Sequence, residues 1–131
     1  MRRGKIKIEN GAMPDRYELE IARVFIEDGF ELRFLKPVNQ DKVKTPDVVI
    51  GGVAWEMKTL RTKKMSGVEQ ALKRASKQSS YVIISMLYNK YLDEADVEKF
   101  LGKKLKEQKS IKRIIIIKRS RGGRKRWKEI I

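Results

Sequence analysis

Two carboxylates and one lysine lie at positions that a β-hairpin would bring together. Asp47 precedes the apolar run Val48–Ile50, and a Gly-Gly pair separates that run from the segment that holds Glu56 and Lys58. A two-residue turn at the glycines would place Asp47 opposite Glu56, with their Cβ atoms about 5 Å apart. Lys58 lies two residues after Glu56, so its side chain would point to the same face of the strand.

This cluster favours a divalent cation bound by oxygen ligands. Like charges that face each other across a hairpin destabilise it unless a positive group lies between them. The chain has no His and no Cys, which excludes imidazole and thiol catalysis and His or Cys metal sites. Oxygen ligands indicate Mg²⁺ or Mn²⁺. The alternative is a solvated, charged strand face that Lys58 stabilises, and spacing alone does not separate the two.

Two more polar residues extend the candidate site. Glu18 falls within the apolar arc of a helix predicted over 14–28, where a carboxylate is costly without a partner. It either completes a three-carboxylate site or reaches solvent at the helix end. Gln78 continues the apolar line of a helix predicted over 66–78. It either points inward or is a polar helix-end residue.

The elements that must position these residues follow from periodicity and turn signals. After a short strand or arm, the pattern predicts a helix over 14–28, a strand over 31–35, a polar loop over 39–45 and the hairpin. A capping box at Ser66-Gly-Val-Glu69 opens the helix over 66–78. The later elements are a strand over 81–85, a helix over 93–108, a strand over 112–118, a turn at 121–123 and a closing strand over 125–131. The sequence therefore predicts one α/β domain over 1–131 with a mixed sheet, an αβββαβ core within about 14–86, and a C-terminal helix and β-hairpin.

The charge distribution indicates a polyanionic partner. The 131 residues include 32 Lys and Arg against 17 Asp and Glu, and the formal net charge is +15. The basic extension 102–131 holds 13 of the basic residues but only two of the acidic ones. Nucleic acid is the usual partner of such a segment, while a solubilising tail or a membrane-surface patch is the alternative. The basic residues expected to contact RNA or DNA are Lys63, Lys64, Lys73, Arg74, Lys77, Arg121, Arg124, Lys125 and Arg126.

The sequence gives no sign of membrane insertion or export. No apolar run approaches the roughly 20 residues that a membrane span needs. The basic N-terminus is not followed by the apolar stretch of a signal peptide. We therefore expect no membrane partner and a cytoplasmic chain, or a piece cut from a larger protein. A nucleic-acid-binding protein without catalysis and a small assembly factor remain as other function classes.

The motifs Thr-Pro-Asp47, Trp-Glu56-Met-Lys58 and Ala-Ser-Lys-Gln78-Ser-Ser-Tyr-Val-Ile-Ile resemble the PD-(D/E)xK nuclease superfamily. Within it they are most similar to the C-terminal toxin domains of contact-dependent growth-inhibition (CdiA) proteins and their mobile-element relatives. The resemblance covers about residues 14–86. It implies a restriction-endonuclease-like core and a metal-dependent endonuclease, with structured RNA such as tRNA favoured as the substrate and DNA next.

The resemblance also implies a role for each candidate residue. Asp47 and Glu56, with Glu18, would hold Mg²⁺ or Mn²⁺, and the backbone carbonyl of Met57 would add a ligand. Lys58 would orient or activate the attacking water. Gln78 would match the second-helix glutamine of this branch. A homodimer and an acidic immunity protein are further partners that the sequence leaves open.

Overall fold

The computed structural model describes residues 3–37, 46–119 and 121–131. The elements in chain order are β1 (Ile6–Ile8), α1 (Arg16–Glu27), β2 (Leu32–Phe34), β3 (Val48–Ile50), β4 (Val53–Thr59), α2 (Met65–Ser76), β5 (Tyr81–Ser85), α3 (Glu94–Glu107), β6 (Arg113–Arg119), a 3-10 turn (Arg121–Gly123) and β7 (Lys125–Ile130). The predicted α/β class, the αβββαβ order of elements and the C-terminal helix and hairpin are confirmed. The polar loop predicted over 39–45 lies outside the described residues.

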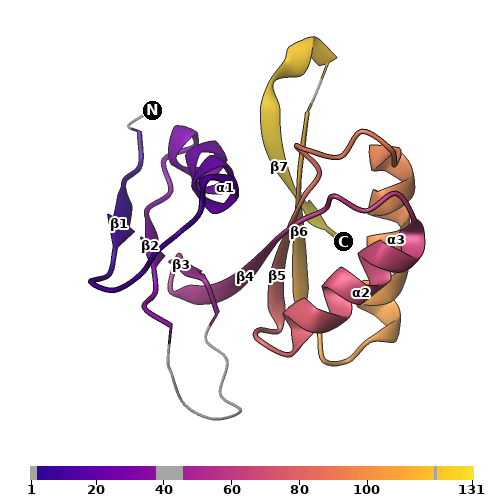
Figure 1. Cartoon of the computed structure of the whole chain (residues 1–131), viewed down its shortest axis with the longest axis horizontal. Helices are drawn as coiled ribbons and strands as arrows, with labels where there is room; N and C mark the ends of the chain where they lie inside the picture. The colour runs from indigo at the N-terminus through magenta and orange to yellow at the C-terminus, as the bar shows by residue number, and fades with distance from the viewer. Residues whose placement is uncertain (1–2, 38–45, 120) are drawn as a thin grey trace.

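The strands form one seven-stranded mixed sheet whose order, β1 to β7, follows the sequence. The pairs β2–β3, β3–β4 and β6–β7 are antiparallel. The pairs β1–β2, β4–β5 and β5–β6 are parallel. Parallel neighbours need a crossover, and each of these three connections holds one helix. Figure 1 shows α2 and α3 packed together beside the sheet, away from α1.

Two apolar clusters occupy the two faces of the sheet. Ile83 and Ile115 belong to the cluster that α1 covers, whereas Val82 and Ile114 belong to the cluster beneath α2 and α3. Because successive strand residues point to opposite faces and both faces are covered, β5 and β6 carry apolar residues at consecutive positions. This explains the unbroken isoleucine run in β6. No helix of the described residues is long and apolar enough to cross a membrane.

The ends of α1 and α2 differ from the sequence prediction. Helix α1 begins at Arg16 after the N-cap residue Asp15, so Pro14 lies outside it. The capping box predicted at Ser66 is wrong, because α2 already begins at Met65 and its N-cap makes no side-chain hydrogen bond. Helix α2 also ends at Ser76, two residues before the predicted end.

Candidate active site

The β3–β4 hairpin has the predicted register. Ile50 pairs with Val53 across a two-residue turn. Gly51 and Gly52 in that turn have φ angles of 57° and 79°. Both angles are positive, as tight hairpin turns require, and glycine adopts them without a steric penalty. The register brings the residue that precedes β3 alongside Glu56, the fourth residue of β4.

That residue, Asp47, is held to β4 by two hydrogen bonds. Its N–H donates to the Trp55 carbonyl oxygen at 3.0 Å. Its Oδ2 accepts from the Met57 N–H at 2.9 Å. The carboxylate is therefore fixed by the backbone of the strand that carries Glu56.

Glu56 is buried and incompletely paired. Its side chain is 3% exposed, and Oε2 lies 3.4 Å from Lys58 Nζ. Within the part of the chain that the structure describes, Oε1 has no hydrogen-bond partner. Burial raises the pKa of Glu56 to about 8, and a hydrogen bond with Asp47 and its charge raise it too, whereas Lys58 acts in the opposite direction. A buried carboxyl oxygen without a partner is costly, so a proton or a cation would stabilise this site.

Glu18 has a helix-capping role that neither alternative from the sequence included. It caps α1: its N–H donates to Asp15 Oδ1 at 2.8 Å, and its Oε1 accepts from the Asp15 N–H at 3.1 Å. This is a capping box of the kind that the sequence suggested for α2 instead. The carboxyl group is also half-buried, and burial raises its pKa to about 7, while the Asp15 N–H opposes the shift and Asp47 adds to it. Glu20 lies away from this cluster and pairs with Lys125 at 3.6 Å.

One cavity of about 340 Å³ brings these groups together. It holds four of the five predicted catalytic side chains, those of Glu18, Asp47, Glu56 and Lys58. The described residues that line it are Asp15, Tyr17, Glu18, Asp47, Glu56, Met57, Lys58, Thr59 and Arg61. The start of α1, which is distant in sequence, therefore meets the β3–β4 hairpin here.

Gln78, the fifth predicted residue, does not line this cavity. It follows the end of α2, and its N–H donates to the Ala75 carbonyl oxygen at 2.9 Å. The next residue, Ser79, donates its hydroxyl to the Ala54 carbonyl oxygen at 2.8 Å, near the start of β4. The predicted inward orientation assumed a helix that continues to Gln78, and α2 ends earlier.

The donor chemistry of the cavity fits a hard divalent cation. Asp47 and Glu56 supply carboxylate oxygens, and Glu56 Oε1 is buried without a partner among the described residues. No three acidic side chains in the described ranges are already gathered closely enough to hold a metal ion. Glu18 is engaged with the Asp15 backbone instead. Asp47 and Glu56 are thus the pair that best fits a cation.

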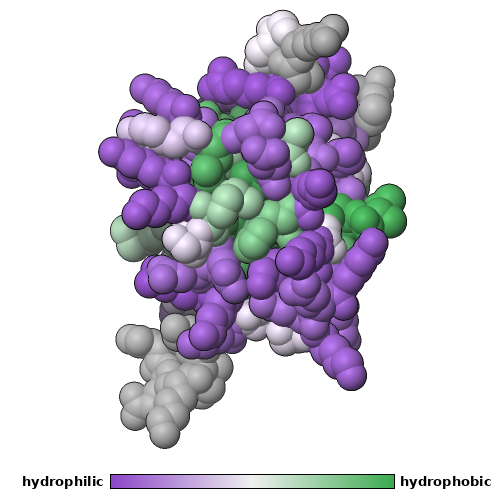
Figure 2. Space-filling model, turned by 90° about the vertical axis from the view of Figure 1, so that its right-hand side faces the viewer, coloured by the Kyte–Doolittle hydropathy of each residue, from purple (hydrophilic) through white to green (hydrophobic). Residues whose placement is uncertain are grey.

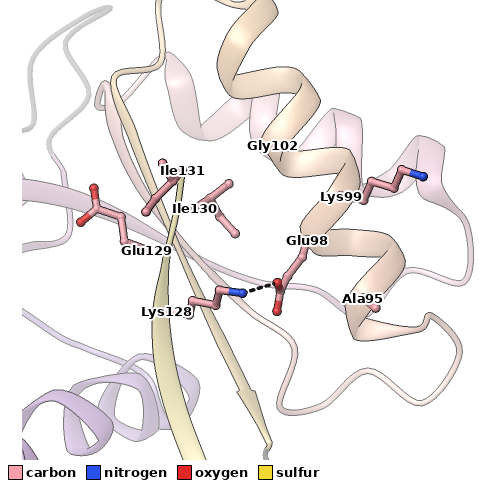
Figure 3. A pocket seen from close by; sticks show the side chains of 8 residues that line it. All are labelled: Ala95, Glu98, Lys99, Gly102, Lys128, Glu129, Ile130 and Ile131. Carbon is pink, nitrogen blue, oxygen red and sulfur yellow. Dashed lines mark hydrogen bonds and ion pairs between the residues drawn. The ribbon is translucent and has the colours of Figure 1, made fainter.

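A larger cavity of about 520 Å³ lies between α3 and β7, as Figure 3 shows. Its carboxylates are already neutralised. Glu98 Oε2 binds Lys128 Nζ at 3.0 Å, and its Oε1 binds Lys118. Glu129 forms a two-pronged ion pair with Arg113. This cavity lacks the unpaired acidic oxygen that distinguishes the site at Glu56.

Comparison with known proteins places this site in a family. The model of the contact-dependent growth inhibition CdiA C-terminal domain matches residues 44–122. The chain belongs to this family. The matched segment begins before Asp47 and contains the whole β3–β4 hairpin together with α2, β5, α3 and β6.

One solved structure with the same architecture is described as the "CdiA-CT/CdiI toxin and immunity complex from Burkholderia pseudomallei". The two chains share 15% sequence identity at a TM-score of 0.64, and the match covers 96% of this chain and 99% of that one. At this identity the likeness shows a common fold. No curated protein matches the sequence.

The basic residues predicted to contact nucleic acid fall on two parts of this CdiA C-terminal domain. One group is exposed on and around α2 and consists of Lys63, Lys64, Lys73, Arg74 and Lys77. Figure 2 shows that the side of the molecule with α2 and α3 is largely hydrophilic around a smaller apolar patch. The other group precedes and begins β7, next to α1, and consists of Arg124, Lys125 and Arg126. The side chain of Arg121 lies outside the described part.

One aromatic and one basic residue of the cavity, Tyr17 and Arg61, were not predicted from the sequence. Tyr17 belonged only to the apolar face of its helix in the sequence, and Arg61 was one of 32 basic residues. No local pattern marks either residue, because α1 and the segment after β4 meet only in the folded chain. The capping role of Asp15 could have been predicted from the spacing of Asp15 and Glu18.

Proposed function

We propose that this CdiA C-terminal domain is a toxin that hydrolyses phosphodiester bonds in nucleic acid with the help of a divalent cation, in the manner of PD-(D/E)xK endonucleases. The observation that carries the proposal is the buried carboxyl group of Glu56 beside Asp47 and Lys58, of which one oxygen has no hydrogen-bond partner among the described residues. The +15 net charge supports a polyanionic substrate. The proposal extends the family assignment to a reaction.

Asp47 and Glu56 would hold Mg²⁺ or Mn²⁺, and Glu18 would complete the acidic set from α1. Such an ion would supply Lewis-acid polarisation of the phosphodiester and favour ionisation of water. Lys58 Nζ, 3.4 Å from Glu56, would stabilise the negative charge that develops on the nucleophile or the phosphate. Water attack at phosphorus would break the P–O3′ bond and leave a 5′-phosphate and a 3′-hydroxyl. Gln78 stays a prediction without a position in the cavity.

The substrate and partners are also proposals. Structured RNA such as tRNA is favoured by the family resemblance, and DNA is the alternative. The solved structure of the same fold is described as a toxin and immunity complex, so we propose that an immunity protein binds this domain too. An acidic surface on that protein would match the +15 charge. We place the action in the cytoplasm and leave homodimerisation as a prediction.

One experiment tests the reaction. Purified domain is incubated with total RNA and with plasmid DNA, in Mg²⁺, in Mn²⁺ and in excess chelator, beside the Glu56→Gln variant. We expect cleavage of at least one substrate only with the metal ions, and none by the variant. Full cleavage in chelator would reject the metal role. Tight binding without any cleavage would instead favour a nucleic-acid-binding protein that lacks catalysis.

A further inference from the structure

The cavity presents a problem for a polyanionic substrate. Among the described residues, its lining includes the carboxyl groups of Asp15 and three further acidic residues but only two cations, Lys58 and Arg61. Lys58 is already paired with Glu56. Arg61 is exposed and forms no ion pair with any carboxylate in the described ranges. Within the described part of the chain, Arg61 is therefore the one cation of the cavity that no carboxylate neutralises and that could bind an entering phosphate.

The backbone around Arg61 is held on both sides. The side-chain amide of Asn89 donates to the Leu60 carbonyl oxygen at 3.3 Å and to the Thr62 carbonyl oxygen at 3.0 Å. The Leu60 N–H donates to the Ser85 carbonyl oxygen at 2.9 Å. Arg61 thus lies just after β4, on a segment whose backbone is held by hydrogen bonds.

The side chain of Arg61 also rests on a fixed surface. Its guanidinium lies 5.6 Å from the centre of the Tyr17 ring, within the range of a cation–π contact. Tyr17 packs edge-on against Tyr88 at 4.8 Å. Arg16 lies 4.8 Å from the centre of the same ring and donates to its hydroxyl at 3.0 Å. Contacts with α1 and with the segment after β5 therefore hold the ring that supports Arg61.

We propose that Arg61 binds a backbone phosphate of the nucleic acid beside the bond to be cleaved, and that Tyr17 and Asn89 position its guanidinium. The inference rests on the proposed function and names the contact that lets a polyanion enter an acidic cavity. A guanidinium matches two phosphate oxygens with two parallel N–H donors, which a lysine ammonium cannot do. This contact is common to RNA and DNA, because both carry the same phosphodiester.

The first test measures binding without catalysis. In the Glu56→Gln background, labelled RNA and DNA oligonucleotides are titrated with the Arg61→Ala and Arg61→Lys variants across a salt series. Arg23→Ala is the matched control, since Arg23 is an exposed arginine of α1 outside the cavity. We expect Arg61→Ala to raise Kd about tenfold or more and to reduce the slope of log K against log salt by about one. Arg61→Lys should restore the slope but not the full affinity. Equal effects of Arg61→Ala and Arg23→Ala on both nucleic acids would overturn the proposal.

The second test separates positioning from stability. Tyr17→Leu should weaken binding when Arg61 is present and should add nothing in the Arg61→Ala background, because its effect passes through the guanidinium. Additive losses in the double variant would reject the positioning role. Cleavage by wild type distinguishes the two proposals: an inactive wild type rejects the nuclease, whereas an active wild type with an unchanged KM in Arg61→Ala rejects only the role of Arg61.

Discussion

The Met57 N–H donates to Asp47 Oδ2 at 2.9 Å, so the acid before β3 is fastened to the backbone of β4 between Glu56 and Lys58. Asp47 is therefore held by a hydrogen bond to the backbone, whereas one buried oxygen of Glu56 has no hydrogen-bond partner among the described residues. The predictions below follow from this difference.

Glu56 should make the metal-free protein less stable as the pH rises. Its pKa is about 8 in the folded chain against an ordinary value of 4.5, so the folded state binds the proton more tightly. Stability is then highest below pH 4.5 as far as this group is concerned, and falls as the pH rises to about 8. Glu56→Gln should flatten this decline. Urea midpoints in chelator between pH 5 and 9 measure it, and parallel curves for the two proteins would contradict the assignment. Glu18, whose pKa is raised to about 7, leaves a smaller decline of the same sign.

Divalent cations should raise the melting temperature of wild type more than that of Asp47→Asn or Glu56→Gln. A ligand that binds only the folded state stabilises it, and the shift grows with ligand concentration. The effect should weaken at lower pH, because a cation must displace the proton from Glu56. Thermal melts with and without Mg²⁺ and Mn²⁺ measure it. Glu27→Gln is the control, since Glu27 is exposed near the end of α1 and does not line the cavity; equal shifts in all variants would place the cation elsewhere.

Lys58→Ala should lower the cleavage rate by about a hundredfold or more, the usual cost of removing one group that stabilises developing charge. Nucleic-acid binding should change much less, because Lys58 is paired with Glu56 and partly buried. The lost ammonium should also raise the pKa of Glu56 further, since Lys58 now opposes the rise. Single-turnover cleavage and oligonucleotide binding separate these effects. A variant that cleaves at the wild-type rate would remove Lys58 from the reaction.

Glu18→Gln should cut turnover at least tenfold, a loss of about 1.4 kcal/mol of barrier lowering. Glutamine can still accept the Asp15 N–H in a capping box, so helix stability should be largely kept. Glu18→Leu should instead destabilise the protein, because it removes a cap bond that the structure shows. Comparing melting temperatures and rates for the two variants separates the cap from the chemistry. Unimpaired turnover in Glu18→Gln would leave this residue with a structural role alone.

Local chemistry made the centre of the site predictable. Two adjacent glycines fix a tight turn, and the turn fixes the register that places Asp47 alongside Glu56. The position of Glu18 followed from helical periodicity, which is also local. The hairpin depends only on residues close in sequence, whereas the meeting of Glu18 with it depends on how α1 packs.

The remainder depends on where elements pack. Arg61 meets Tyr17 because α1 packs next to the end of β4, and no pattern within either segment records that. Gln78 was placed by extending a helical projection two residues beyond the true end of α2 at Ser76. Side-chain direction in a helix turns by about 100° per residue only while the helix lasts. A small error in a helix boundary therefore moved a predicted side chain out of the cavity.

The order of the strands, which follows the chain from β1 to β7, has a mechanical consequence. The first and last strands are the two edges of the sheet, so a force applied to either end of the chain acts on an edge strand. Removing β1 breaks one ladder, whereas removing β7 breaks one ladder and also the contacts of Trp127 with Phe25 and Asp28 at α1. Refolding differs between the pairs, because β3–β4 and β6–β7 close across short turns, whereas β1–β2, β4–β5 and β5–β6 pair only after a connection that holds a helix has closed. The β3–β4 and β6–β7 hairpins are therefore the ladders that can form across the shortest loops.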